Sequence, residues 1–150
     1  MENDLFNKEY CPIIKAMDQI GDKWCMLILR ECFLGSRRFD EFQHHLGISK
    51  SVLSAKLQKM VRQDLLKKVP YQNDGERTRH EYRITEKSRD FRKVLIGLLN
   101  WGNKYLVEEG EETMYIIDDQ ERPVTLQVVN GAKEPVLYRN TEMIIRSKKL

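Results

Sequence analysis

The stretch that decides the fold is residues 39–82, which read FDEFQHHLGISKSVLSAKLQKMVRQDLLKKVPYQNDGERTRHEY. The segment Asp40 to Leu46 carries apolar residues at helical spacing, and a tight turn at Gly47-Ile48 follows it directly. Ser49 comes next, and its hydroxyl suits the N-cap of a second helix. Asn73-Asp74-Gly75 then forms a strong turn signal between two strand-like runs. This order predicts two helices joined by a turn, followed by a β-hairpin.

The second helix is expected from Lys50 to about Asp64. Leu53, Leu57, Met60 and Val61 recur on one stripe of it, which is the pattern of a helix with one buried face. The opposite face carries no carboxylate before Asp64, and Lys50, Ser54 and Lys56 are expected on its flanks. Its small side chains would allow the backbone to approach the floor of a major groove, where the longer ones would reach bases or phosphates. The residues predicted to contact DNA from this helix are Ser49, Lys50, Ser51, Ser54, Ala55, Gln58, Lys59 and Arg62.

The hairpin is expected to consist of strands Lys67 to Tyr71 and His80 to Ile84. Pro70 cannot donate to a ladder, so its strand should be an edge, which a two-stranded wing allows. Alternation along the strands predicts that Lys68 and Arg83 point outward. The residues predicted to share the inner face are Val69, Tyr71, Tyr82 and Ile84.

The positive charge of the chain is concentrated in its middle. Residues 36–93 carry fifteen Lys and Arg against eight Asp and Glu, whereas the segments 1–35 and 94–150 are each net negative. A polyanion partner explains this concentration, because neutralising phosphates releases condensed counterions. Double-stranded DNA is therefore the predicted partner. Further basic residues are expected to contact the DNA. They precede the helix at Asp40 to Leu46 or lie at the hairpin tip: Arg37, Arg38, Arg77 and Arg79.

Helices are also expected on both sides of this region. Pro12 opens one that ends at Gly21, Lys23 to Leu34 forms a central buried helix, and Thr85 caps a long helix from Glu86 to about Glu108. The apolar stripe of the long helix is broader than one small domain needs, which predicts a homodimer, although packing on Trp24 and its neighbours is the alternative. The predicted dimer interface comprises Phe91, Leu95, Leu98, Leu99, Gly102 and Tyr105.

The pattern divides the chain into an N-terminal arm at 1–10, a winged-helix domain at 11–108 that includes the dimerisation helix 86–108, and a β-rich extension at 109–150. The period of the hydrophobic pattern changes beyond Gly110 from helical to alternating. The strands expected in the extension are Met114–Ile117, Val124–Val129, Val136–Tyr138 and Met143–Ile145.

Several function classes are excluded by what the sequence lacks. It has no phosphate-binding glycine loop, no Gly-x-Ser-x-Gly elbow and no Cys-x-x-Cys pair, so we expect neither an enzyme nor a cofactor. His44 and His45 are adjacent, and on a helix their side chains diverge too far to hold one metal. Together with His80 of the hairpin, they are interpreted as polar or phosphate-contacting residues. Three cysteines without paired spacing and no long apolar segment predict a reduced, cytoplasmic protein that does not bind membranes.

Several separated motifs resemble the HxlR-type winged helix-turn-helix transcriptional regulators over about residues 9 to 107. They are Cys11-Pro12-Ile13, Gly21-Asp22-Lys23-Trp24, Arg38-Phe39-Asp40-Glu41-Phe42, Gly47-Ile48-Ser49, Leu53, Leu57 and Ile84-Thr85-Glu86. The resemblance implies an α+β fold, mainly helical, with a recognition helix at Ser49 to Asp64, a wing at Leu66 to Ile84 and a long C-terminal dimerisation helix. It also implies a homodimer on a palindromic operator. The strand-rich tail from Gly110 departs from many short members.

The resemblance further implies that Cys11 senses oxidants or electrophiles, as the cysteine of the Cys-Pro motif does in some members. The helix start at Pro12 would aim N–H groups at the sulfur and favour the thiolate. The alternative is a small capping or core residue, which is also the role expected of Cys25 and Cys32. Two other functions stay open: a metabolite-responsive regulator with an effector pocket near the C-terminal tail, and a winged-helix protein-interaction module that does not bind DNA.

Overall fold

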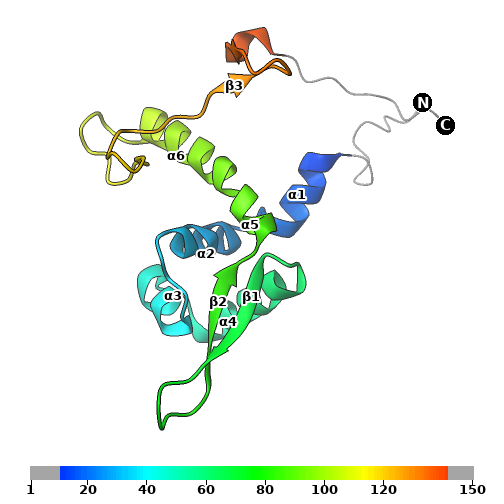
Figure 1. The fold of residues 1–150 in the computed structure, drawn as a ribbon, viewed down its shortest axis with the longest axis vertical. Helices are drawn as coiled ribbons and strands as arrows, with labels where there is room; N and C mark the ends of the chain where they lie inside the picture. The colour runs from blue at the N-terminus through cyan, green and yellow to red at the C-terminus, as the bar shows by residue number, and fades with distance from the viewer. Residues whose placement is uncertain (1–10, 142–150) are drawn as a thin grey trace, which may run out of the picture. The chain divides into compact units, whose positions relative to one another are not determined.

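The computed structural model describes residues 11–141, and the chain divides into two compact units, Cys11–Leu95 and the part from Ile96 onward (Figure 1). The fold is the predicted α+β winged helix with a two-stranded wing, a long C-terminal helix and a small β-hairpin tail. The expected arm at 1–10 and the expected strand Met143–Ile145 lie outside the described residues. The elements in order are α1 (Pro12–Ile20), α2 (Lys23–Phe33), α3 (Phe39–Leu46), α4 (Lys50–Arg62), β1 (Leu66–Tyr71), β2 (Arg79–Ile84), α5 (Glu86–Asp90), α6 (Arg92–Leu106), β3 (Val128–Val129), β4 (Pro135–Val136) and the short 3-10 helix Tyr138–Asn140.

The core of the first unit joins the helices to the base of the wing. Phe42 of α3 is fully buried and meets the ring of Tyr82 of β2 edge-on, with ring centroids 6.4 Å apart. Burying such apolar side chains is the main favourable contribution to folding. The stripe expected to face inward on α4 does so, and the opposite face of α4 therefore remains in solvent. The fully buried side chains are those of Cys25, Ile28, Leu29, Phe42, Leu53, Leu57, Met60, Leu66 and Ser88.

Local signals in the sequence set the helix ends. The Ser49 hydroxyl accepts a hydrogen bond from the Val52 N–H at 3.4 Å, as the N-cap prediction requires. Gly47 ends α3 in the left-handed conformation with φ of 60°, which glycine adopts without steric cost. Cys11 occupies the N-cap of α1 with Pro12 after it, but its side chain makes no capping hydrogen bond.

Asp22 connects two helices. One of its carboxylate oxygens accepts hydrogen bonds from the N–H groups of Trp24 at 2.9 Å and Cys25 at 3.2 Å, which caps α2. The other oxygen pairs with the ammonium of Lys56 on α4. Burial alone raises the pKa of Asp22, but the hydrogen bonds and the positive charge of Lys56 outweigh it and lower the pKa. Lys56 thus fixes α4 against α2 instead of belonging to the solvent-facing basic surface.

The register of the wing corrects the expected strand faces. Lys68 lies opposite Tyr82, and Val69 lies opposite Glu81. Residues that oppose each other across an antiparallel pair share one face of the sheet. Lys68 therefore lies on the face of Tyr82 and Ile84, whereas Val69 and Tyr71 lie on the other. The prediction was wrong because β1 begins at the buried Leu66, which pairs with Ile84.

A further segment pairs with the free edge of β2. The Tyr82 N–H donates to the Arg37 carbonyl at 2.7 Å, and Arg38 forms an isolated bridge with Glu81. This pairing could not be predicted from the sequence, because two residues are too few to show a periodic pattern. The segment before α3 is thereby attached to the wing.

The expected continuous helix from Glu86 to Glu108 is broken at Phe91 and ends at Leu106. The Phe91 N–H donates to the carbonyl of Ser88 at 3.1 Å, three residues back, instead of continuing the four-residue helical spacing. Phe91 and Leu95 pack against the buried core of the first unit. Thr85 caps α5 as expected, and its hydroxyl donates to the Asp64 carbonyl at 2.7 Å, which holds α5 to the end of α4.

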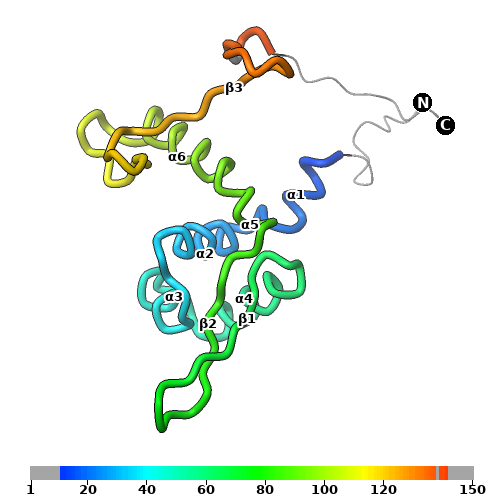
Figure 2. The backbone as a smooth tube through the Cα atoms, viewed as in Figure 1, coloured from blue at the N-terminus to red at the C-terminus, as the bar shows by residue number. Residues whose placement is uncertain are grey.

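The tail contains less strand than the alternating pattern predicted. Between Gly110 and residue 141, where the description ends, only Val128–Val129 and Pro135–Val136 form a ladder, and a 3-10 helix begins at Tyr138, where a strand was expected to end. The tail returns along α6 (Figure 2): Asn103 donates to the Met114 carbonyl at 2.8 Å, and a β-carbon on Gly97 would meet Leu126 Cδ1 at 3.5 Å. The first two expected strands meet in one isolated bridge, Ile117 with Pro123, where the Val124 N–H donates to the Ile116 carbonyl at 2.8 Å. An extended chain with one face covered alternates in polarity even where few of its residues pair, which explains the mistaken prediction.

Candidate nucleic-acid interface

The solvent-facing side of α4 presents the residues that the sequence predicted for DNA contact. Ser54 and Lys59 are half-buried at its margins. Val52 was not among the residues predicted for DNA contact, and it is 37% exposed beside this face. An exposed apolar side chain here suits contact with a thymine methyl group in the major groove. The predicted residues that the structure leaves exposed at this helix are Ser49, Lys50, Ser51, Ala55, Gln58 and Arg62.

The wing ends in loop 72–78, and Arg77 lies in this loop just before Arg79 of β2 (Figure 1). A turn closed by a 3.0 Å hydrogen bond from the Glu76 N–H to the Asn73 carbonyl forms the tip, and Gly75 has φ of 78° there. Within residues 11–141 neither arginine belongs to an ion pair, so both charges remain available to a phosphate. Arg83 differs, because its guanidinium pairs with the Glu81 carboxylate at 2.5 Å.

Arg37 and Arg38 are held beside the wing by their backbone. The Glu41 carboxylate accepts hydrogen bonds from the N–H of Arg37 at 2.7 Å and of Arg38 at 2.9 Å. These bonds lower the pKa of Glu41, and the carboxylate also faces the positive N-terminal end of α3. The guanidinium of Arg38 lies over the ring of Tyr71, 4.8 Å from its centroid. Both arginine side chains are exposed.

His45 has a structural role in the protein, in contrast to the polar or phosphate-contacting role that adjacency with His44 suggested. Its Nδ1 lies 2.9 Å from a carboxylate oxygen of Glu31, which is only 5% exposed on α2. Arg30 and Ser36 also donate to Glu31, at 2.8 and 3.3 Å. Burial raises the pKa of Glu31, but these hydrogen bonds outweigh it, so the pKa lies below its ordinary value. No cluster of three metal-binding side chains occurs among the described residues.

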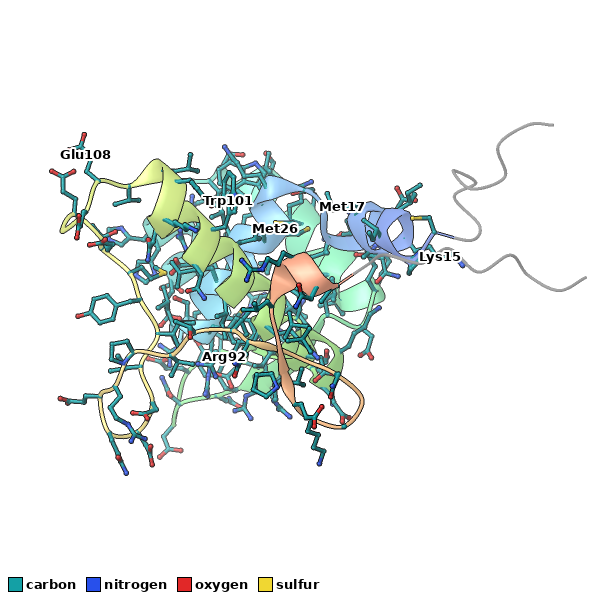
Figure 3. All side chains as sticks on the ribbon, turned by 90° about the horizontal axis from the view of Figure 1, so that it is seen from above. Lys15, Met17, Met26, Arg92, Trp101 and Glu108 are labelled. Carbon is teal, nitrogen blue, oxygen red and sulfur yellow. The ribbon has the colours of Figure 1, made fainter. Side chains whose placement is uncertain are left out.

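The predicted dimer residues separate into two sets. Phe91 and Leu95 belong to the core of the first unit, and Leu99 and Gly102 are half-buried. Leu98 and Tyr105 are exposed, and with Val94 and Trp101 they form a stripe spaced four, three and four residues apart on α6; Figure 3 labels Trp101 on that helix. We call these four residues the α6 stripe; their exposed fractions are 44% for Val94, 48% for Leu98, 56% for Trp101 and 60% for Tyr105.

The three cysteines are free thiols in different surroundings. Burial raises the pKa of the Cys25 thiol, and the negative charge of Asp22 adds to this effect. Burial raises the pKa of Cys32 to about 12. Both thiols therefore stay protonated at neutral pH, as expected of core residues. Cys11 is half-buried at the start of α1.

Comparison with known proteins gives one consistent result. The HxlR-like helix-turn-helix family matches residues 19–110. An uncharacterized HTH-type transcriptional regulator of Mycobacterium bovis is 44% identical over 92 residues, which cover 61% of this chain and 57% of that protein. The crystal structure of PA1607, a candidate transcription factor, is 32% identical and superposes with a TM-score of 0.79 over 99% of this chain and all of PA1607.

The redox regulator HypR in its oxidised form is 24% identical, with a TM-score of 0.56 over 63% of this chain and 96% of HypR. A likeness at this level shows the fold alone. In the part of the chain that the structure describes, no helix is both long and apolar enough to cross a membrane.

Proposed function

This chain belongs to the HxlR-like helix-turn-helix family of transcriptional regulators, and we propose that it acts in the cytoplasm as a homodimer that binds a palindromic DNA operator. In this proposal the N-terminal part of α4 enters the major groove of each half-site. The wing contacts the flanking backbone or minor groove. The chain matches little more than half the length of its mycobacterial relatives, so the partners of the whole protein are part of the proposal.

The observation that carries the proposal is the solvent face of α4. It presents small residues, Ser51 and Ala55, beside Gln58 and Arg62, and it carries no carboxylate. The small residues permit close approach to bases. The Gln58 amide offers a donor and an acceptor to an adenine, and the Arg62 guanidinium offers paired N–H donors to a guanine or a phosphate. Arg37, Arg38, Arg77 and Arg79 would contact phosphates, which positions the protein without reading sequence.

Salt dependence tests the proposal directly. The affinity of the full chain for its own promoter region should fall steeply between roughly 50 and 200 mM salt, because each phosphate contact contributes close to one unit of the log-log slope. Fluorescence anisotropy with a labelled duplex measures it, and an unrelated duplex of equal length is the control for sequence preference. Affinity that is flat across this range, or equal for both duplexes, contradicts sequence-specific DNA binding.

The homodimer is supported by the α6 stripe. Four large apolar side chains at a heptad-like spacing are 44–60% exposed in the single chain. Helices pair through stripes of this spacing, since each side chain then meets the partner helix. Two α6 helices packed along this stripe would hold two copies of α4 together on one operator.

We also propose that Cys11 makes the regulator responsive to oxidants or electrophiles. Cys25 and Cys32 are held as unreactive thiols by burial, which leaves Cys11 as the candidate at the start of α1. Diamide should reduce operator binding by the wild-type protein and leave Cys11→Ser unaffected, as measured by anisotropy before and after a reductant. Equal responses of the two proteins would remove Cys11 as the sensor, and Cys32→Ser is the matched control.

A further inference from the structure

Two shallow depressions lie on either side of the same pair of wing residues, Lys68 and Tyr82. The first lies between α4 and the wing, and Gln58 and Arg62 complete its wall. The second lies between the start of α3 and the wing. Because both contain Lys68 and Tyr82, they adjoin at these two side chains and follow one another across the first unit.

The register of the wing explains why Lys68 lines both depressions together with Tyr82. Lys68 lies opposite Tyr82 in the β1–β2 ladder, so the two side chains project from the same face. Lys67 lies opposite Arg83 and projects from the other face. Tyr71 and Arg79 project from that other face too, and they line the second depression only. Lys67, which is exposed and carries the same charge as Lys68, lines neither depression.

The charge along this path is predominantly positive. Arg62 lies at one end, Lys68 in the middle, and Arg38 and Arg79 line the second depression together with His80. Asp40 is the carboxylate that also lines the second depression. Among the described residues, Lys68 forms no ion pair, so its charge is not neutralised within the chain.

Contacts within the protein hold two of the side chains that line the depressions, Arg38 and Tyr82, in place. Arg38 lies over the ring of Tyr71, and Tyr82 is fixed by its edge contact with Phe42 and by its N–H bond to the Arg37 carbonyl. Burial raises the pKa of Tyr82, so its hydroxyl keeps its proton and can donate to an anion. Donors fixed before binding lose little freedom when the ligand arrives.

We propose that the two depressions form one track for the backbone of a single DNA strand, with Lys68 placed between two neighbouring phosphates. One phosphate lies with Arg62 and Lys68 next to α4, and the other lies with Lys68, Arg38 and Arg79 next to α3. This inference rests on the proposed DNA-binding function and assigns the residue that links major-groove contacts of α4 to the wing. The spacing between α4 and the wing on the duplex would follow from these two contacts.

The first test compares Lys68→Ala with Lys67→Ala in the full chain. Lys68→Ala should lower affinity for every duplex about tenfold and reduce the salt slope by roughly one to two units, since it removes one positive charge from each protomer of the proposed dimer. Lys67→Ala should stay within about twofold of wild type, because Lys67 lines neither depression. Thermal unfolding of both variants shows whether each is folded, and both substitutions are at exposed strand positions.

The second test uses operator duplexes in which one phosphate at a time is replaced by a neutral methylphosphonate. In wild type, two neighbouring replacements on one strand should weaken binding, and in Lys68→Ala the same two should cost much less. Such a loss of effect is the coupling expected for groups in direct contact. Equal effects of Lys67→Ala and Lys68→Ala, or a phosphate profile unchanged by Lys68→Ala, would overturn the track and leave the proposed function standing. Salt-insensitive binding by wild type would overturn both.

Discussion

Replacing Leu98 with glutamate should convert the proposed homodimer into a folded monomer and lower operator affinity by about a hundredfold or more. Leu98 is a central member of the α6 stripe, and around a two-fold axis the new carboxylates would face each other or an apolar partner surface. Burying an unpaired charge costs more than the apolar contact contributes. Joining two half-site contacts raises affinity by roughly 10²–10⁴, and the monomer loses this gain.

Sedimentation velocity measures the change in mass, and anisotropy with full and half operators measures the loss in affinity. Lys93→Glu is the matched control, because it introduces the same side chain on an exposed position of α6 outside the stripe. It should remain a dimer. A Leu98→Glu protein that sediments as a dimer would show that the interface lies elsewhere, for example in the tail after Gly110.

Replacing Glu31 with alanine should lower the free energy of unfolding by about 1–3 kcal/mol at neutral pH. The Glu31 side chain is 5% exposed and accepts hydrogen bonds from Arg30, Ser36 and His45, and the bond from His45 joins the end of α2 to α3. Without it, the buried Ser36 hydroxyl loses an acceptor and α3 loses its tie to α2. Urea unfolding followed by circular dichroism measures the effect. Asp74→Asn, at an exposed carboxylate of the wing loop, should change stability by less than about 0.5 kcal/mol.

The contribution of Glu31 should also depend on pH. Its pKa in the folded protein lies below the ordinary value of 4.5, so the unfolded chain binds the proton more readily. The stabilisation is therefore fully present above about pH 4.5 and is lost as pH falls through the folded pKa. Glu31→Gln keeps the shape without the charge, so its deficit against wild type should shrink on acidification. A deficit that is constant from neutral to acidic pH would contradict this account.

Two tertiary contacts differ from what the sequence predicted for the interface. Lys56 was expected among the basic residues flanking α4, but it pairs with Asp22, thirty-four positions earlier in the chain. Lys68 was expected to point away from Tyr82, and the register places the two side by side. Both errors concern partners that are distant in sequence. No periodic pattern within one element specifies which distant residue it will meet.

The sequence by itself determined the features that depend on near neighbours. Pro12 began α1, Ser49 capped α4, Asn73-Asp74-Gly75 turned the wing, and Thr85 capped α5, because each relies on hydrogen bonds or backbone preferences within a few residues. The apolar stripe of α4 also fixed its buried face, and thereby its solvent-facing basic face, since a helix has one period.

Only the tertiary structure decided how these elements are joined. It placed Phe91 in the core and broke the long helix there, which left Val94 and Leu98 on the exposed side. It paired the segment at Arg37 and Arg38 with β2, and it laid the alternating tail along α6 in place of most of the expected strands. These choices follow from the competition of many apolar surfaces for burial, which is a property of the whole chain and not of any local pattern.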